Sequence, residues 1–453
     1  MKITIIGCDK IGTALLNLLD REEHDVCVVD IEPSRVKRAC EKFDITGVVG
    51  NGASYDVQKK AGVGDCDLVV AATNADEVNI LCCMVAKELG CVHTVIVNNN
   101  EKYFDQIEHL REKYNINLSV SPEKESAAEV ARMLRFPAAL QVEIFADGKM
   151  ELVAVILPDD SEFVGFSIAE KHGKEYPEIQ ICAVERNGEV FIPSGNFVLE
   201  AGDRLSLAST VTGISKYLRK TGLYQSKVKN VFILGGNNYG YYIAKAVAPM
   251  GVKVTIMESD RERCKYLSEE LSKAIIINGN DNDYELMRNE GLENTDAFVA
   301  ITNNNEKNII ASLYAQNKGV NKVITAVDES NLFSVVDEID LGSVVSQNVL
   351  TATRVLHFVK GMQSAKDSGS KLDAIFTIAG GNAFILEFAV NESFSGANIP
   401  LKDIELKKDT IIAMIIRDKQ VIVPRGNDAI LVGDKVIVVT KQNDVDGINE
   451  VLL

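Results

Sequence analysis

The segment Lys2–Gly12, a strand-like run followed by a turn, reads Lys-Ile-Thr-Ile-Ile-Gly-Cys-Asp-Lys-Ile-Gly. Its β-branched run ends at Gly7, and Ile11–Leu19 has the apolar spacing of an amphipathic helix. A strand that turns at once into a helix is the setting that a dinucleotide fingerprint requires. Gly7 permits a tight turn, Gly12 lets helix and strand pack closely, and the free N–H groups between them suit a phosphate. We call Gly7–Gly12 the first glycine turn.

The glycine turn occurs twice in the chain. The second glycine turn, Gly235–Gly240, lies 228 positions after the first. Further blocks recur in the same order with nearly the same displacement, which indicates a tandem duplication. These blocks are Ala71–Asn74 with Ala300–Asn303, Ile192–Gly195 with Val423–Gly426, and Gly202–Arg204 with Gly433–Lys435.

Each copy changes character along its length. Its first part alternates short β-branched runs with amphipathic helical stretches, which predicts βαβ units around a parallel sheet with helices on both faces. In the first copy these runs are Lys2–Ile6, Asp25–Val29, Thr46–Val49, Leu68–Ala72 and His93–Val97. Its second part has strand-like runs and a hairpin signal, Asn187-Gly188, which predicts a small α+β domain. The runs there are Gln141–Phe145, Met150–Leu157, Ile179–Arg186 and Arg204–Ala208.

The predicted fold class is α/β, with two Rossmann-like doubly wound parallel-sheet domains, each followed by a small α+β domain. We assign the two Rossmann-like domains to residues 1–136 and 228–360, and the two small domains to residues 137–220 and 368–453. Linkers are predicted near Phe136-Pro137, across Arg219–Lys229 and across Gly361–Lys371.

The composition excludes several classes of protein. The 48 Lys and Arg residues against 65 Asp and Glu residues give a net charge of −17, which argues against a nucleic-acid partner. The nine cysteines are odd in number and form no Cys-x-x-Cys pair, which favours reduced thiols in a reducing cytosol. The sequence has neither a signal-peptide pattern nor an apolar stretch of about 18–20 residues. We therefore expect a soluble cytoplasmic protein.

Both copies carry an acidic residue at the end of the second predicted strand. Asp30 lies 18 residues after Gly12, and Glu258 lies 18 residues after Gly240. A carboxylate at this position can accept hydrogen bonds from both ribose hydroxyls and repels a 2′-phosphate. The pattern therefore favours NAD-type or adenosine ligands over NADP.

The middle glycine of the full fingerprint is replaced in both copies, by Asp9 in the first and by Asn237 in the second. Asn237 tolerates unusual backbone angles. The Asp9 carboxylate would face phosphate oxygens unless it turns away or pairs with Lys10. We expect the first site to bind poorly or to prefer a ligand without a diphosphate at that point. The alternative is that both turns are only tight strand–helix connections.

Small polar loops follow the third and fourth predicted strands of each copy. Since ligands of open α/β sheets lie outside the carboxyl ends of the strands, these loops are expected to rim an adenosine site. They are Val49–Ser54 and Ala72–Glu77 in the first copy, and Asn278–Asp281 and Ile301–Glu306 in the second. Helix capping by Asn and Thr is the other interpretation, and both can hold at once.

No catalytic or metal-binding pattern is evident. The five histidines lack metal-ligand spacing, and each is interpreted as a surface or helix-end residue. They are His24, His93, His109, His172 and His357. No local signature of a nucleophilic triad is present, so we predict no catalytic residue and no metal site. Cys82-Cys83 is interpreted as helix core.

Several motifs together resemble the RCK (KTN) domain family. In the first copy they are Gly50–Ser54, Ala61–Asp67 and Ala72–Asn79, and the small domain adds Glu185–Gly188, Pro193 and Gly202-Asp203. The resemblance covers essentially the whole chain. It implies that the following residues contact a nucleotide, NAD⁺ or NADH, or else ATP or ADP. These are Gly7, Cys8, Asp9, Lys10, Ile11, Gly12, Asp30, Thr73, Asn74 and Asn98, and then Gly235, Gly236, Asn237, Asn238, Tyr239, Gly240, Glu258, Thr302 and Asn303.

The resemblance also implies a function. Members with two such domain pairs are cytoplasmic regulatory subunits of Trk-type potassium uptake systems, and they assemble as homo-oligomers, a dimer or a tetrameric ring. They dock beneath the membrane-spanning potassium-translocating subunit, which places them peripherally on the inner face of the cell membrane. The alternatives are an NAD-dependent dehydrogenase or a regulator of a different cation channel or antiporter. A dehydrogenase needs an acid/base beside the nicotinamide, and the small domains offer no His or Lys-Tyr constellation for it.

The segment Glu123–Leu134 is predicted to be a helix with Ser121 as its N-cap and Pro122 in its first turn. Its apolar stripe is Ala127, Val130, Ala131 and Leu134. The stripe can pack within the chain or against another subunit. In the family, helices at this place cross between neighbours, which favours a role in assembly.

Overall fold

The computed structural model describes the chain except for residues 21–23, 100–102, 137–140, 146–148, 222–227, 333–334, 337–338, 340, 368–370, 379–381, 419, 443–444 and 446. The chain divides into two compact units. One unit combines Met1–Arg135 with Val228–Leu356, and the other combines Phe136–Lys227 with His357–Leu453. The four separate domain boundaries remain a prediction.

The first copy begins with a six-stranded parallel sheet in the order β3-β2-β1-β4-β5-β6. Its strands are β1 (Lys2–Ile6), β2 (Asp25–Asp30), β3 (Thr46–Val49), β4 (Leu68–Ala71), β5 (His93–Val97) and β6 (Leu118–Val120). Because β1 pairs with both β2 and β4, the strand order reverses beside the first glycine turn. This is the switch point at which open α/β sheets bind ligands.

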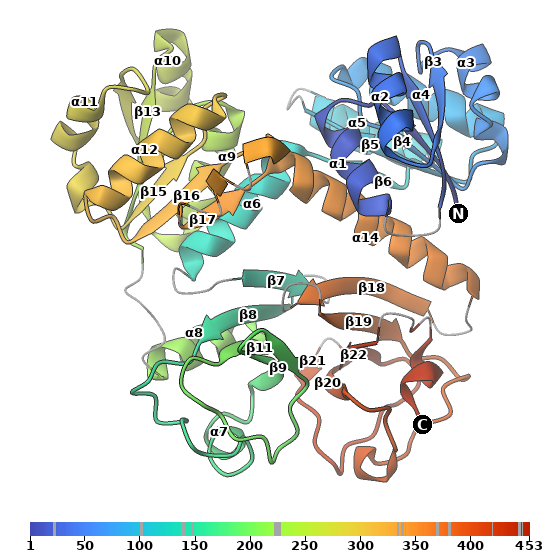
Figure 1. Ribbon diagram of the computed structural model, residues 1–453, viewed down its shortest axis with the longest axis vertical. Coiled ribbons are helices and arrows are strands. Elements are labelled where there is room, and N and C mark those ends of the chain that lie inside the picture. Colours follow the sequence, from blue (N-terminus) through green and yellow to red (C-terminus); the bar gives the residue numbers. More distant parts are fainter. Residues whose placement is uncertain are drawn as a thin grey trace. The chain divides into compact units, whose positions relative to one another are not determined.

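Helices cover both faces of this sheet (Figure 1). They are α1 (Lys10–Leu19), α2 (Pro33–Lys42), α3 (Tyr55–Lys60), α4 (Asp76–Leu89) and α5 (Phe104–Tyr114), with a 3-10 turn η1 (Val63–Asp65). The helix α6 (Pro122–Arg135) follows β6 and packs against the second copy. Gly90, with a φ of 105°, ends α4 in the left-handed conformation. Cys82 and Cys83 are fully buried in α4, as predicted. The Rossmann-like fold class is confirmed for this copy.

The second copy repeats the arrangement with the order β14-β13-β12-β15-β16-β17. Its strands are β12 (Asn230–Leu234), β13 (Lys253–Glu258), β14 (Ile275–Asn278), β15 (Ala297–Ala300), β16 (Lys322–Ala326) and β17 (Ser343–Val345). Its helices are α9 (Asn238–Val247), α10 (Arg261–Glu270), α11 (Tyr284–Asn289), α12 (Asn305–Asn317) and α14 (Gln347–Asp367), with 3-10 turns η3 (Ala248–Met250), η4 (Leu292–Asn294) and η5 (Ser330–Leu332). The duplication is therefore visible in three dimensions.

One linker prediction is wrong. Residues 361–367 belong to α14, which continues to Asp367 because the Ser, Gly and Lys residues there do not interrupt its helical hydrogen bonding. The rest of that predicted linker, residues 368–370, lies outside the described residues. The same holds for Pro137 and for residues 222–227, which were also predicted to be linkers.

The small domains are antiparallel sheets in the orders β10-β9-β11-β8-β7 and β18-β19-β22-β20-β21. The first contains β7 (Gln141–Phe145), β8 (Met150–Ile156), α7 (His172–Glu175), β9 (Gln180–Arg186), β10 (Glu189–Phe191), β11 (Arg204–Thr210) and α8 (Val211–Lys220). The second contains β18 (Lys371–Ile378), β19 (Ala383–Ala389), η7 (Leu401–Asp403), β20 (Thr410–Arg417), β21 (Gln420–Ile422), β22 (Lys435–Thr440) and η8 (Ile448–Val451). The predicted hairpin at Asn187-Gly188 joins β9 to β10, with both residues at positive φ.

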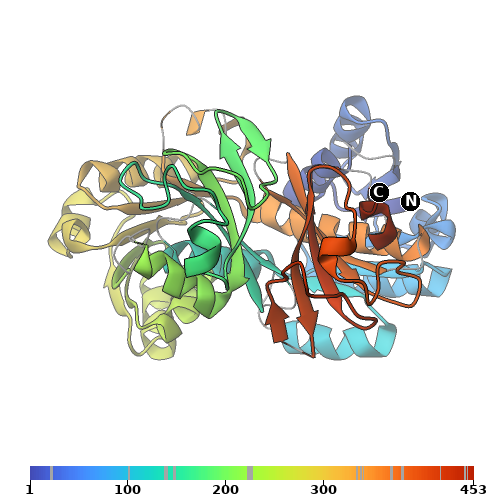
Figure 2. The ribbon, with the colours of Figure 1, turned by 90° about the horizontal axis from the view of Figure 1, so that it is seen from below.

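The repeated Gly-Asp block of the small domains has a structural reason. Asp203 is fully buried and accepts two hydrogen bonds from the Arg186 guanidinium, at 2.7 and 2.8 Å. Asp434 receives the same pair from Arg417, at 2.9 and 2.7 Å. One apolar core joins the two small sheets, which lie side by side (Figure 2), and includes Cys182 from one and Ile385 from the other.

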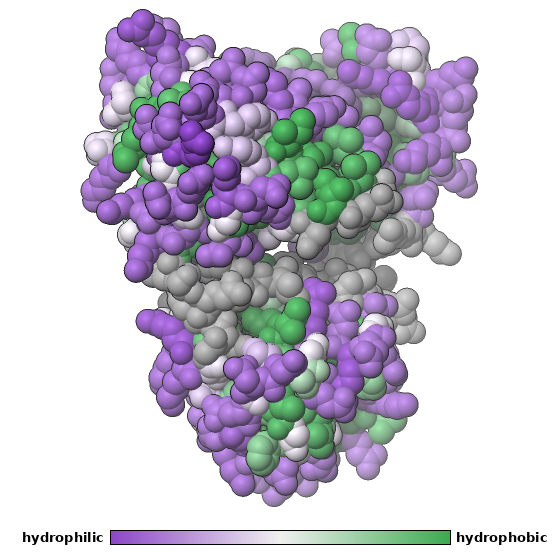
Figure 3. All heavy atoms as spheres, turned by 60° about the vertical axis from the view of Figure 1, so that its left-hand side comes forward, coloured by the Kyte–Doolittle hydropathy of each residue, from purple (hydrophilic) through white to green (hydrophobic). Residues whose placement is uncertain are grey.

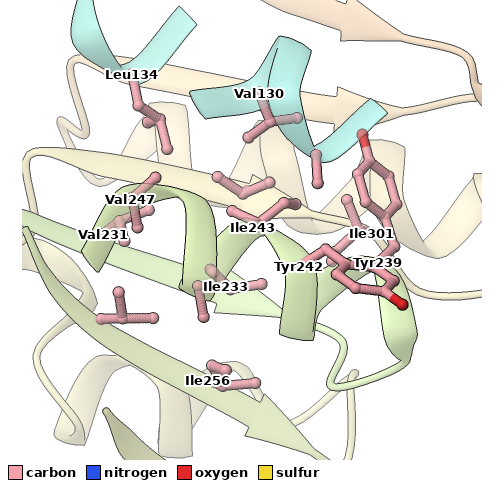
Figure 4. Packing of buried hydrophobic residues seen from close by; sticks show 14 of the residues in the cluster. Val130, Leu134, Val231, Ile233, Tyr239, Tyr242, Ile243, Val247, Ile256 and Ile301 are labelled. Carbon is pink, nitrogen blue, oxygen red and sulfur yellow. The ribbon is translucent and has the colours of Figure 1, made fainter. Parts of the chain in front are cut away.

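The apolar stripe of α6 packs within the chain. Val130 and Leu134 lie against Ile243 and Val247 of α9, so a helix of the first copy completes the core of the second (Figure 4). The Tyr239 hydroxyl donates a hydrogen bond to the Ser126 carbonyl at 3.5 Å. The expectation that this stripe serves assembly between subunits is therefore corrected. The neighbour that it crosses to is the second copy of the same chain.

The interpretation of His172 as a surface or helix-end residue is wrong in one respect. His172 begins α7, but its side chain is 1% exposed and lies among Phe163, Tyr176 and Tyr217. Its Nε2 lies 3.2 Å from the Tyr217 hydroxyl. Burial lowers the pKa of His172 to about 4, so the imidazole is neutral at pH 7.

The surface agrees with the charged composition. Hydrophilic side chains cover most of the face shown in Figure 3, with smaller apolar patches between them.

All nine cysteines are free thiols, and seven of them are buried. In the part of the chain that the structure describes, no helix combines the length and the apolar character needed to cross a membrane.

The packing of α6 predicts a stability effect. Leu134→Ala removes a side chain that is 1% exposed and leaves a cavity between α6 and the second copy. We expect the free energy of unfolding to fall by about 2–5 kcal/mol. Denaturant unfolding measures the change. Glu125→Ala on the same helix is the control, with an expected change of about 0.5 kcal/mol or less. Equal effects of the two substitutions would contradict the packing role.

Candidate functional site

The two glycine turns are constrained by close backbone approach. Gly7 has a φ of 102°, and a Cβ atom there would lie 2.6 Å from the Ala72 carbonyl oxygen. A Cβ atom on Gly12 would lie 2.0 Å from the Gly7 carbonyl oxygen. Gly235 and Gly240 are confined in the same way in the second copy. No other residue fits these positions, which agrees with the roles that the sequence predicts for the outer glycines.

The acidic strand ends hold the two turns. Asp30 ends β2 and is 6% exposed, and its Oδ2 accepts a hydrogen bond from the Cys8 N–H at 2.7 Å. Glu258 ends β13, and its Oε2 accepts from the Gly236 N–H at 2.7 Å. Each carboxylate therefore fixes the turn beside it through a charge-assisted hydrogen bond. The ribose contact that the sequence predicts for both residues remains a prediction.

In the second turn, Asn237 caps the following helix and contacts the loop after β15. Its Oδ1 accepts a hydrogen bond from the Gly240 N–H at 3.1 Å and caps α9. Its Nδ2 donates to the Ile301 carbonyl at 2.9 Å and lies 3.2 Å from Asn303 Oδ1. The half-buried side chain therefore joins the turn to the loop after β15 without adding a charge.

In the first turn, Asp9 contacts the equivalent loop but does not cap its helix. It makes no cap hydrogen bond to α1. Instead its Oδ2 accepts a hydrogen bond from Asn74 Nδ2 at 2.9 Å and lies 3.6 Å from Arg35 Nη2. Arg35 Nη1 lies 3.8 Å from Asp30 Oδ2. The sequence interpretation offered Lys10 as the partner of Asp9, and the structure assigns this place to Arg35 and Asn74.

Two buried asparagines fix the loops that follow β4 and β15. Asn79 Oδ1 accepts from the Thr73 N–H and hydroxyl at 2.9 and 2.6 Å, and its Nδ2 donates to the Thr73 and Val97 carbonyls, both at 2.9 Å. Asn308 makes the same contacts with Thr302 in the second copy. Sequence reasoning gave these asparagines no role. Their identical spacing from the two threonines was the signal that could have identified them.

The remaining predicted residues of the site vary in their accessibility. Lys10 is exposed and Ile11 is half-buried at the start of α1, whereas Cys8 is buried. Asn98 is fully buried after β5, where its N–H donates to the Val120 carbonyl at 2.8 Å. Tyr239 is 2% exposed and packs with α6, so its side chain belongs to the core.

A pocket of about 270 Å³ opens beside the second glycine turn. The ends of β12, β13, β14 and β15 meet there, which is the edge that the topology predicts for a ligand. Two residues of its lining form an ion pair, in which Lys307 Nζ donates hydrogen bonds to both carboxylate oxygens of Asp281, each at 2.9 Å. The lining residues are Gly235, Asn237, Met257, Glu258, Ser259, Gly279, Asp281, Thr302, Asn303, Asn304 and Lys307.

An arginine beside each turn was also missed from the sequence. In the second copy, Arg263 Nε donates to the Gly236 carbonyl at 2.7 Å and Nη2 donates to Asn238 Oδ1 at 2.9 Å. Arg35 occupies the equivalent position 228 residues earlier. The repeat itself was the signal, because both arginines follow the acidic strand end by five residues.

The fold and the site define a class. Two parallel sheets with this strand order, each with a glycine turn hydrogen-bonded to an acidic strand end, are Rossmann-type nucleotide-binding domains. The family follows from sequence comparison. The TrkA-N domain model matches residues 3–122 and 231–347, and the TrkA-C domain model matches residues 152–222 and 385–453. The chain belongs to the TrkA-N domain family, in a tandem arrangement with TrkA-C domains.

Relatives of similar length match along nearly the whole chain. "Trk system potassium uptake protein TrkA homolog" of Archaeoglobus fulgidus is 29% identical over 453 residues, which is 100% of both chains. "Trk system potassium uptake protein TrkA homolog 2" of Methanosarcina mazei is 29% identical over 450 residues, which is 97% of both. "Trk system potassium uptake protein TrkA" of Haemophilus influenzae is 28% identical, over 97% of this chain and 95% of that one.

Solved structures share the fold. The GsuK RCK domain has a TM-score of 0.63 and 17% sequence identity, with 97% of this chain and 92% of that chain covered. The GsuK channel bound to NAD has a TM-score of 0.64 and 16% identity, with 97% and 76% covered. The tandem fold predicted from the sequence is thereby confirmed.

The buried asparagines predict a measurable effect. Asn308→Ala removes the partners of the Thr302 N–H and hydroxyl, and of two carbonyls, at a position 1% exposed. We expect a loss of about 2–4 kcal/mol in the free energy of unfolding, measured with denaturant. Asn317→Ala, on the exposed side of the same helix, is the control and should change it by about 0.5 kcal/mol or less. A neutral Asn308→Ala would refute the anchoring role.

Proposed function

We propose that the chain is a nucleotide-sensing regulatory subunit of a potassium uptake system. The observation that carries the proposal is the collinear match, over 97–100% of the chain, to proteins named for Trk potassium uptake. A match of this extent includes both Rossmann-type domains and both small domains, so it concerns the whole architecture. Its ligand would be NAD⁺ or NADH, or ATP or ADP.

The second site is the better candidate for nucleotide binding. A helix begins at Asn238, directly at the turn, and its first N–H groups have no partners within the helix. With Arg263 beside them, they suit the phosphates of a nucleotide. The protein's own backbone leaves no room for side chains at Gly235 and Gly240, which keeps the turn tight at the amino end of α9. Glu258 would accept hydrogen bonds from the ribose, and the polar loops after β14 and β15 would enclose the base.

Nucleotide binding would act on the rest of the chain through α9. The amino end of α9 forms the glycine turn, and its side packs against Val130 and Leu134 of α6. A ligand that prefers one position of α9 therefore biases the position of α6 and of the first copy that carries it. The coupling free energy between ligand and assembly is then set by the difference in affinity for the two arrangements.

The partner would be the membrane-spanning potassium-translocating subunit. We infer a homo-oligomer, a dimer or a tetrameric ring, that works in the cytoplasm and reaches the inner face of the membrane through this partner. The net charge of −17 gives the chain no attraction to anionic lipid, which favours docking on protein. We propose no catalytic residue and no resident metal.

The proposal predicts binding without turnover. Titration of the purified full-length chain with NADH and with ATP should show saturable binding. Incubation of NAD⁺ with small alcohols and hydroxy acids, and of NADH with the matching carbonyl compounds, should show no hydride transfer. Deletion of the gene should reduce potassium uptake in cells, and the wild-type chain should restore it. Turnover at about 1 s⁻¹ or faster would instead favour the dehydrogenase.

A substitution tests the ribose and turn assignment. Glu258→Ala removes the acceptor of the Gly236 N–H and should weaken nucleotide binding at least about tenfold. Glu262→Ala, exposed on the following helix, removes the same charge and should leave the affinity unchanged. If the two variants bind alike, the assignment of Glu258 is wrong. If neither variant nor the wild type binds a nucleotide, the proposed function is wrong.

A further inference from the structure

We infer that only the second site accepts a diphosphate, because the first site is closed to it by the protein's own carboxylate, Asp9. The inference rests on the proposed function, since it assigns ligand classes to the proposed nucleotide sites. It is carried by a contrast between two turns with the same backbone frame. They differ at the middle position, which is Asp9 in one and Asn237 in the other.

In the first copy, the Asp9 carboxylate connects the glycine turn to two neighbouring elements. It accepts a hydrogen bond from Asn74, on the loop after β4, at 2.9 Å, and lies 3.6 Å from the Arg35 guanidinium on α2. These groups border the space between the glycine turn and the neighbouring loop. That space is where the phosphates of a dinucleotide would lie. The Asp9 carboxylate therefore takes up the donors that a phosphate would need.

The positive charge of the first site is also neutralised. Arg35 lies within ion-pair distance of two carboxylates, those of Asp9 and Asp30. These three side chains together carry a net charge of −1. A diphosphate brings at least two further negative charges, and Coulomb repulsion at a few ångströms in a partly buried site is substantial.

The second copy has a similar connection but a different charge. Asn237 caps α9 and reaches Asn303, the equivalent of Asn74, through an uncharged amide. Arg263 donates to the Gly236 carbonyl and to Asn238, and within the described ranges no carboxylate lies at ion-pair distance from it. The guanidinium stays at the turn, hydrogen-bonded to neutral acceptors, and Glu258 is the carboxylate that flanks the same residue, Gly236. This arrangement, together with the pocket beside it, suits the diphosphate of a dinucleotide or a nucleoside diphosphate.

The test is the binding stoichiometry of the full-length chain, measured by isothermal titration calorimetry with ADP and with NADH. The wild type should bind one ADP, or one NADH, per chain. Asp9→Asn gives the first turn the residue type of the second and releases Arg35. It should bring the stoichiometry to two per chain, with the affinity of the first site raised at least about tenfold.

The reciprocal substitution is Asn237→Asp. An aspartate there keeps the acceptor for the Gly240 N–H, so α9 remains capped, but it loses the amide donor to Ile301 and Asn303 and adds a negative charge to the second turn. This variant should lose ADP and NADH binding at the concentrations that saturate the wild type. Asp9→Gly, which restores the full fingerprint glycine, is a second route to the gain and does not depend on the behaviour of asparagine.

The outcomes separate the two claims. A wild type that binds two ADP per chain overturns the inference and leaves the proposed function intact. A wild type that binds neither nucleotide overturns the proposed function. If the wild type binds one ADP and both Asp9 variants still bind one, Asp9 is not the barrier and the inference is wrong. Two per chain in either Asp9 variant, with none in Asn237→Asp, supports it.

Discussion

The hydrogen bond from an acidic strand end to a backbone N–H of the glycine turn is the interaction on which both copies depend. Asp30 Oδ2 accepts from the Cys8 N–H and Glu258 Oε2 accepts from the Gly236 N–H, in each case at 2.7 Å. This contact joins β2 to the β1–α1 turn, and β13 to the β12–α9 turn. It fixes the direction in which the helix leaves the strand, and hence where its free N–H groups point. The paired asparagines, Asn79 and Asn308, then fix the facing loop, so the rim of each site is set by buried polar contacts.

The duplication preserved this frame and changed the charges within it. A carboxylate at position 9 contacts Asn74 and Arg35, whereas an uncharged amide at position 237 contacts Asn303 and leaves Arg263 hydrogen-bonded to the turn backbone. The same topology therefore supports two turns with different electrostatics. The helix α6 joins the copies, because its apolar stripe completes the core around α9. A change at the second turn thus has a physical route to the first copy, through α9 and α6.

Local patterns predicted much of the architecture. The bounds of β1, β3 and β5 agree with the predicted runs, because their β-branched residues lie in a sheet whose order follows from the βαβ alternation. The sequence could not show which part of the protein the apolar stripe of α6 packs against. Such a stripe indicates that one face of the helix is buried, but not which residues cover it. Two further features depend on contacts between residues far apart in the chain. His172 is buried among aromatic rings, and Asp9 lies at ion-pair distance from Arg35 rather than from Lys10. The ribose and phosphate roles remain predictions from motif and geometry.

We propose that nucleotide binding at the second glycine turn drives the regulatory response. Hydrogen exchange of the full-length chain, measured by mass spectrometry with and without saturating NADH, tests it directly. The account predicts slower exchange at residues 235–240 and 302–308, and unchanged exchange at residues 7–12. Protection that is absent from residues 235–240, or equal at both turns, would contradict it.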